Sequence, residues 1–384
     1  DGATRFLRTD LGKVYCEMTN PAFPLFTGNN IFRTTDVNVV GAPTTVVASF
    51  KTLNDANNGE VIFAGSRKTA LYIDWRGDGT EYKPYDVNTS YIAYPGQRTF
   101  AGANVKIYTY EQPTDITVFS LYGMPMAEAD LTPLTGLKAL VIGGAGLTAD
   151  NLKLPQAQLQ ELSLQYNDLH DYPYMEKYPD LNMLNITGNK LTYFDASPLK
   201  QLQSLYAGSN QLDSIHLNNA SLWELSLEHN RLDSIDFSNA RSIQQMNLDN
   251  NLFHKINMRN LRRNLRVLSI SGNYFTFQTL PLQSDFPQLT NYFYANQAPV
   301  DAIVSDDYMV YDLSSQATVN GIATEYTWFL GDPVYNSDEG TLSGETLVAD
   351  DEYTLKDGVT TFADFCKEYQ EKLVCVMTNS LFPK

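Results

Sequence analysis

An asparagine recurs through the middle of this chain at steps of 20 to 22 residues, always inside the same leucine frame. The six copies are Asn167, Asn189, Asn210, Asn230, Asn251 and Asn273. The frame reads Leu-x-x-Leu-x-Leu-x-x-Asn-x-Leu. A fixed period of this length predicts a solenoid of stacked structural repeats.

The frame continues on both sides of these six turns with a substituted asparagine. Ala145 and Met124 take the asparagine position in two upstream turns, and Gln297 takes it in one downstream turn. Six good turns and three degraded ones together predict a leucine-rich repeat array over residues 116–297. A helical interpretation is disfavoured, because it needs a 3.6-residue period and fewer chain breakers.

Each predicted turn is a short strand followed by a return segment, and one turn cannot bury its apolar side chains alone. Stacking supplies the core, at about 1.5–3 kcal/mol for each fully buried large apolar side chain. We expect the asparagine amide to donate to and accept from backbone groups of neighbouring coils. A repeat of about 21 residues has no room for a full helix on the convex side, so extended or 3₁₀ turns are expected there.

Length and charge limit the classes of protein. The chain has 384 residues, so more than one domain is expected, and its formal net charge is −17. That charge repels phosphate backbones and anionic lipid, which argues against binding of nucleic acid or membrane surfaces. The sequence has no apolar run of transmembrane length and does not begin with a signal peptide. We expect a mature, exported fragment whose signal and anchor lie outside it.

The three cysteines, Cys16, Cys366 and Cys375, have no metal-ligand spacing. Cys366 and Cys375 either form a bridge across a hairpin or are buried thiols on strands. The four histidines are scattered through the repeats without nucleophile-base spacing. The sequence therefore predicts no enzyme, no metal and no cofactor.

The two ends of the chain are similar to each other. Residues 6–24 align without gaps to residues 365–383, sharing among others Cys16/Cys375, Asn20/Asn379 and Phe23/Phe382. In the C-terminal copy this stretch closes a strand-rich segment, 298–384, which we predict to be an immunoglobulin-like β-sandwich. Residues 1–26 then correspond to the terminal hairpin of such a module. We expect this hairpin to dock on another sheet edge, either in its own chain or by self-association.

Residues 27–115 are predicted to form a β-rich capping domain, with strand-like runs separated by glycine and asparagine turns. Its sequence from Asp74 to Thr80 resembles the Trp-x-x-Gly-Asp-Gly-Thr turn of polycystic-kidney-disease-type sandwiches, shifted by one residue. Asp74 and Asp78 either stabilise this turn or bind calcium. Arg76-Gly77-Asp78 also matches the tripeptide that integrins bind.

The repeats with their Asp-Ser-Ile return segments (213–215 and 233–235), the Asp-Gly turn and the C-terminal strands resemble surface leucine-rich repeat proteins of Bacteroidetes, often called internalin-like or BspA-like. The resemblance implies an exported cell-surface adhesin, used for host attachment, co-aggregation, biofilm formation or virulence. It departs from the internalin pattern because it has no recognisable helical cap before the repeats.

Strand parity predicts which side chains face outward on the concave side. They include Glu161, Ser163, Asn185, Ser226, Gln245 and Ser269. Charged and aromatic residues are densest in the middle of the array, where we place the ligand-contacting residues: Tyr206, Trp223, Glu224, Glu228, His229, Asn247 and Asp249. A basic or amide-rich protein partner fits such a face, and the alternative is a glycan. Sparse aromatic platforms favour the protein.

Overall fold

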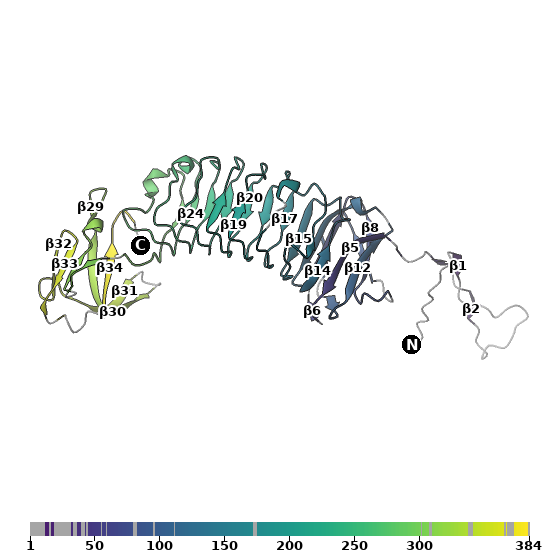
Figure 1. Ribbon diagram of the computed structural model, residues 1–384, viewed down its shortest axis with the longest axis horizontal. Coiled ribbons are helices and arrows are strands. Elements are labelled where there is room, and N and C mark those ends of the chain that lie inside the picture. Colours follow the sequence, from purple (N-terminus) through teal and green to yellow (C-terminus); the bar gives the residue numbers. More distant parts are fainter. Residues whose placement is uncertain are drawn as a thin grey trace, which may run out of the picture.

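The molecule is an elongated, gently curved spine with a separate unit at its C-terminal end (Figure 1). The computed structural model describes residues 43–382, apart from 44, 55, 59, 80–82, 95–96, 111, 172–174, 301, 307–308, 337–340, 365 and 367–371. Of the first 42 residues it describes 12–14, 17–18, 32–33 and 37–39.

The spine is a β-solenoid of about eight turns of about 21 residues, which confirms the predicted leucine-rich repeat fold. One strand from each of the nine predicted frames joins a single sheet, in which successive strands are parallel. The strands are β13 (Ile116–Tyr122), β15 (Ala139–Gly143), β17 (Glu161–Ser163), β18 (Met183–Asn185), β20 (Ser204–Tyr206), β22 (Glu224–Ser226), β23 (Gln245–Asn247), β24 (Val267–Ser269) and β25 (Asn291–Phe293).

The repeated asparagines link adjacent coils through their amides, as predicted. Asn210 is typical: its Nδ2 donates to the carbonyls of Ile186 and Ala207 at 3.0 and 3.1 Å, and its Oδ1 accepts from the Leu191 amide at 3.1 Å. Gln297 does the same in the last turn, accepting from the Phe275 amide and donating to the Ile270 carbonyl. The degraded downstream repeat therefore keeps the function of the asparagine.

The leucine positions of the frame form the core. Leu162, Leu184, Leu205 and Leu268 are each fully buried, and Met124 and Ala145 are buried where the asparagine is replaced. The return segments are short strands and 3₁₀ turns, as the repeat length predicted. They are β19 (Tyr193–Asp195), β21 (Ser214–His216), η2 (Met175–Lys177), η3 (Arg259–Leu261) and η4 (Gln283–Asp285).

The strands before the solenoid extend it on both sides. β7 (Glu60–Gly65) pairs antiparallel with β13, and β5 (Thr45–Thr52) pairs antiparallel with β14 (Met126–Asp130). β10 (Ile92–Tyr94) completes the eleven-stranded sheet. A second, six-stranded sheet contains β5 and β14 together with β12 (Asn104–Thr109), β8 (Thr69–Asp74), β9 (Lys83–Val87) and β16 (Leu152–Lys153). β6 (Ala56–Asn58) pairs with β11 (Gln97–Thr99), and η1 (Pro113–Asp115) leads into the first repeat. The two regions share one hydrophobic core.

The C-terminal unit contains two sheets around its own small core. One sheet contains β26 (Ile303–Val304), β27 (Val310–Asp312), β33 (Val359–Phe362) and β32 (Tyr353–Lys356). The other contains β31 (Thr341–Thr346), β30 (Glu325–Asn336) and β34 (Leu373–Thr378). η5 (Ser314–Gln316) and the pair β28 (Thr318–Val319) and β29 (Ile322–Ala323) complete it. Cys366 and Cys375 are free thiols, so the alternative of a bridge is not realised.

The described strands of the first 42 residues pair with one another. β1 (Gly12–Val14) pairs with β4 (Val37–Val39), and β2 (Glu17–Met18) pairs with β3 (Phe32–Arg33). The pairing thus extends past residue 26, where we placed the end of the terminal hairpin. Cys16 and the rest of the 1–26 segment lie outside the described residues.

Candidate functional site

The outward side of the eleven-stranded sheet, called the sheet face below, is the surface predicted to be concave. Strand register aligns its side chains in columns that cross the coils. One column contains Ser163, Asn185, Tyr206, Ser226, Asn247, Ser269 and Phe293; the next contains Glu161, Met183, Ser204, Glu224, Gln245, Val267 and Asn291. The predicted outward positions therefore occupy one face, separated by about 4.8 Å from coil to coil.

Tyr206 and Glu224 are directly bonded on this face. The Tyr206 hydroxyl donates to Glu224 Oε2 at 2.5 Å, across adjacent strands. Burial is the main cause that raises the pKa of Tyr206 to about 12, and the hydrogen bond and charge of Glu224 add to it. The hydroxyl therefore keeps its proton at neutral pH and holds the carboxylate in place.

The other predicted acids are also held by neighbouring groups. Glu228 accepts from the Ser226 hydroxyl at 2.5 Å. Asp249 accepts from the Ser269 hydroxyl at 2.7 and 2.8 Å and from the Ser271 amide at 2.6 Å. These carboxylates brace the sheet face before any ligand is considered. An ionised carboxylate has about four lone-pair sites, so each can still accept from a partner.

His229 and Trp223 lie on opposite edges of the sheet face, as predicted. His229 has a φ of 55°, a left-handed conformation that recurs just before the repeated asparagine in Tyr166, Ser209 and Asn250. The Nε2 atom of His229 lies 3.4 Å from the side-chain nitrogen Nδ2 of Asn250. Trp223 comes just before β22, and its backbone amide donates to the Gln203 carbonyl of the preceding coil. The seven predicted residues therefore span the width of the face and do not form one pocket.

A hollow of about 240 Å³ lies in the C-terminal half of the sheet face. Its lining includes Glu224, Gln245, Asn247, Val267 and Phe293. Glu224 and Asn247 belong to the predicted set, whereas Phe293 was missed. Phe293 is 53% exposed and comes from the last, degraded repeat. Extending the parity argument by one more turn, to 291–293, would have found it.

In the capping domain, the Asp74 side chain contacts the backbone of the Asp-Gly turn. Asp74 is buried, and its two carboxylate oxygens accept from the backbone amides of Gly77 and Gly79 at 2.9 and 2.7 Å. Its oxygens therefore stabilise the turn, which is the first of the two alternatives for Asp74. The Arg76 guanidinium lies over the Phe100 ring at 5.3 Å. The integrin hypothesis for Arg76 and Asp78 stays untested.

Within the described part of the chain, no group of three or more His, Cys, Asp or Glu side chains is placed to hold a metal ion. Burial raises the pKa of the Cys375 thiol to about 12, which disfavours the nucleophilic thiolate. Over the same residues, no helix is long and apolar enough to cross a membrane.

The fold and this face define a leucine-rich repeat solenoid with an open, polar surface. Among solved structures, the chain is similar to internalin InlF from Listeria monocytogenes at 25% identity, covering 44% of this chain and 52% of that one, with a TM-score of 0.35. It is also similar to InlJ from Listeria monocytogenes (16% identity, 73% and 93% covered, TM-score 0.33) and to the leucine-rich repeat domain of APL1B (19%, 46% and 59%, 0.35). The chain thus spans about half the length of the InlF structure. No family model and no curated protein matches the chain.

Proposed function

We propose that this protein is a non-enzymatic scaffold that binds a protein partner through the sheet face of its solenoid. The observation that carries the proposal is the combination of braced carboxylates and one exposed aromatic ring around a shallow hollow. Glu224 lines that hollow together with Gln245 and Phe293. Protein interfaces are typically built from an aromatic anchor surrounded by polar groups that need little reordering.

The charge of the face favours a partner with basic or amide groups. Glu224, Glu228 and Asp249 are held by hydrogen bonds within the protein, so they lose little conformational freedom when a partner binds. The net charge of −17 adds long-range attraction for a basic surface. An arginine or lysine that enters the hollow would contact both the Glu224 carboxylate and the Phe293 ring.

The setting we propose is the surface of a bacterium. The sequence resemblance to Bacteroidetes internalin-like and BspA-like proteins supports export and adhesion to host cells or other bacteria, including biofilm formation. On this proposal the C-terminal unit, with its two sheets around Trp328, is an immunoglobulin-like module that follows the solenoid. The alternative function is that of a glycan-binding surface module.

The test compares binding of the labelled full chain to epithelial cells and to co-resident bacteria. Phe293→Ala/Gln245→Ala removes the anchor and an exposed amide of the hollow, and we expect binding at least about tenfold weaker. The matched control is Tyr193→Ala/Gln211→Ala, because Tyr193 is also 53% exposed but lies on a return strand.

A protein partner predicts that protease treatment of the target cells abolishes the share of binding that Phe293→Ala/Gln245→Ala removes. Equal binding of the Phe293 variant and the control variant would contradict the proposal. So would a Phe293-dependent share of binding that survives protease but is lost after periodate oxidation of surface sugars.

A further inference from the structure

A second surface, distinct from the hollow, lies along the edge of the sheet where the chain enters each strand. Five carboxamides from successive coils line it: Gln158, Gln160, Asn182, Gln201 and Gln203. Its charged members are Lys138 and Asp180, one of each sign. The space between these side chains is about 260 Å³. We call these seven residues the amide trough.

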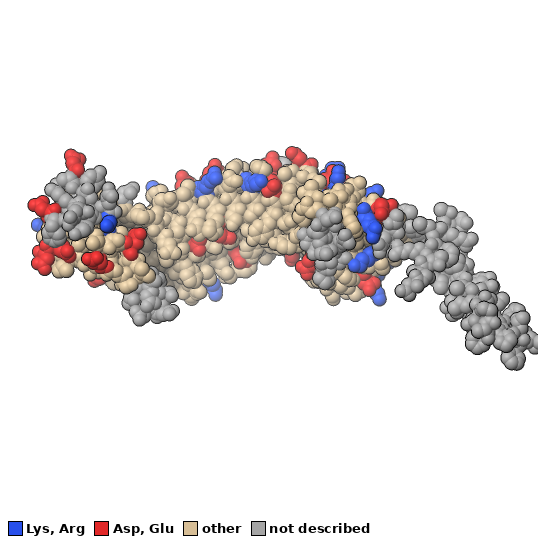
Figure 2. Space-filling model, turned by 90° about the horizontal axis from the view of Figure 1, so that it is seen from below, with Lys and Arg blue, Asp and Glu red and all other residues tan. Residues whose placement is uncertain are grey.

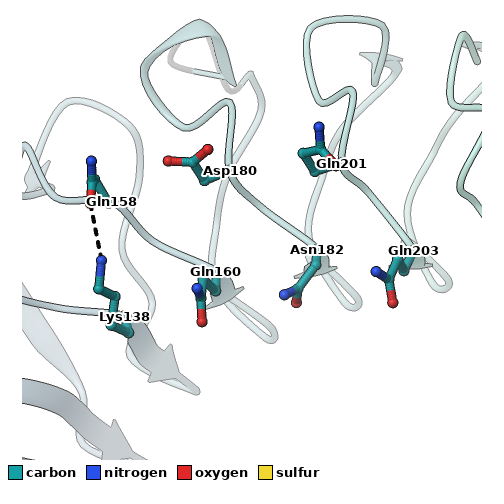
Figure 3. A pocket seen from close by; sticks show the side chains of 7 residues that line it. All are labelled: Lys138, Gln158, Gln160, Asp180, Asn182, Gln201 and Gln203. Atoms are coloured by element: carbon teal, nitrogen blue, oxygen red, sulfur yellow. Dashed lines mark hydrogen bonds between the residues drawn. The ribbon is translucent and has the colours of Figure 1, made fainter.

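The repeat generates two parallel rows in the trough (Figure 3). Gln160, Asn182 and Gln203 each come just before a strand, and Gln158, Asp180 and Gln201 form a second row two residues earlier in each coil. Backbone hydrogen bonds of 2.8 to 2.9 Å connect the first row from coil to coil, from Lys138 through Gln160 and Asn182 to Gln203. The same ladder continues to Trp223, whose amide donates to the Gln203 carbonyl at 2.9 Å.

The trough opens into a larger hollow on the side of the capping domain. This hollow, about 600 Å³, shares Lys138 and Gln158 with the trough and also contacts Gln156 and Lys177. Lys138 Nζ donates to Gln158 Oε1 at 3.2 Å, so the lysine is tied to the amide row. A chain-like ligand can therefore pass from one hollow to the other along the same edge.

We infer that the amide trough binds a neutral polysaccharide chain that runs along the solenoid. A carboxamide both donates and accepts, which matches a hydroxyl group, itself a donor and an acceptor. The charges of Lys138 and Asp180 balance, whereas the net charge of the protein repels an anionic glycan. This site is independent of the protein-binding function proposed for the sheet face.

The spacing of the coils favours a sugar chain over an extended peptide. Adjacent coils repeat at about 4.8 Å, whereas peptide groups on one side of an extended chain repeat at about 6.7 Å. A peptide along the trough would therefore fall out of register with the amides after one or two coils. Each sugar ring has hydroxyls on both edges, so successive rings can contact successive coils. The half-buried Trp223 occupies the next position of this row.

The experiment is native affinity electrophoresis of the full chain in gels containing laminarin, mannan or galactan, with polygalacturonate and gelatin as the acidic and polypeptide probes. We expect at least one neutral polysaccharide to retard the protein. Gln160→Ala/Gln203→Ala should weaken that retardation about tenfold, since four donor and acceptor groups are lost. The control Gln211→Ala/Gln288→Ala removes two glutamines outside the trough and should leave retardation unchanged.

Several outcomes would overturn the inference. These are no retardation by any neutral polysaccharide, retardation by gelatin or polygalacturonate alone, or equal retardation of the trough and control variants. Thermal unfolding of both variants checks that the fold is intact, which we expect because Gln160 and Gln203 are exposed. Phe293→Ala/Gln245→Ala should bind polysaccharide normally, so failure at the sheet face and failure at the trough are distinguishable.

Discussion

The two ends of the solenoid are closed in different ways. At the N-terminal end, β7 and β5 continue the sheets of the first coil, and Phe63 and Phe119 pack with ring centroids 5.6 Å apart in one shared core. At the C-terminal end, the following unit has its own cluster around Trp328 and contributes Val319 and Phe382 to the solenoid core. We conclude that the capping domain and solenoid fold as one unit, whereas the C-terminal unit is an attached module (Figure 1).

The solenoid and the C-terminal unit also differ in how charged side chains are distributed on their surfaces. Viewed from below, the solenoid surface is largely uncharged, with charged side chains gathered along its edges, whereas acidic side chains cluster on the C-terminal unit (Figure 2). The binding proposed for the solenoid therefore depends on local groups such as Glu224 or the amide trough. The overall charge acts mainly on approach.

Phe63→Ala is expected to have the largest effect on stability. Phe63 is fully buried between Phe119 of the first repeat and Tyr85 and Tyr94 of the cap. Truncation should lower the free energy of unfolding by about 4 kcal/mol, because a cavity remains at the junction. Urea unfolding followed by tryptophan fluorescence measures it, since Trp75 lies in the cap and Trp223 in the repeats. A separate early transition of the cap alone would show that the two regions do not form one unit.

Trp328→Ala should destabilise the C-terminal unit by about 3 kcal/mol and leave the main transition of the solenoid in place. Trp328 is buried against Phe362, 4.8 Å between ring centroids, and its Nε1 donates to the Thr360 hydroxyl at 3.1 Å. Calorimetry should show a low-temperature transition shifting down by itself. A concerted shift of every transition would mean that the two units are coupled.

The solenoid could be predicted from the sequence because the same leucine and asparagine frame recurs in successive repeats. The buried leucines, the asparagine ladder, the substitution by Gln297 and the 3₁₀ return turns are all present. The strand runs of the capping domain were also found, but not their pairing onto β13 and β14. That pairing joins residues far apart in the chain, and hydrophobic alternation within a strand does not identify its neighbour.

The candidate site was predicted only in part. Parity placed Tyr206, Glu224 and Asn247 on one face, but the hydrogen bonds that hold Glu228 and Asp249 depend on side-chain rotamers that a frame does not specify. Phe293 was missed because its repeat is degraded. The amide trough was missed because its residues precede the strands, although Gln160, Asn182 and Gln203 occupy one position of the frame.

Phe382→Ala tests how firmly the C-terminal module is attached. Phe382 stacks on Phe277 at 5.5 Å and lies 5.8 Å from Tyr294, both in the solenoid. Loss of these contacts should lower the stability of the junction by about 2 kcal/mol, a smaller effect than at Phe63 because the ring lies at an interface. Limited proteolysis should then cleave near residues 298–306 faster. The control Leu355→Ala, at an exposed position within the module, should leave that rate unchanged.

Asp115→Asn should give the smallest effect, and a pH-dependent one. Arg67 of the cap donates to Asp115 at 2.8 and 3.0 Å, and this hydrogen bond is the largest cause that lowers the pKa of Asp115 below its ordinary 3.8. The stabilisation is therefore present above pH 3.8 and disappears as the pH falls through the lower folded-state pKa. Urea midpoints should differ slightly between wild type and variant at pH 7 and converge as the pH falls below the lowered pKa of Asp115, with Asp213→Asn as the exposed control. A gap that widens on acidification would instead mean that the pair of Arg67 and Asp115 does not stabilise η1, which leads from the cap into the first repeat.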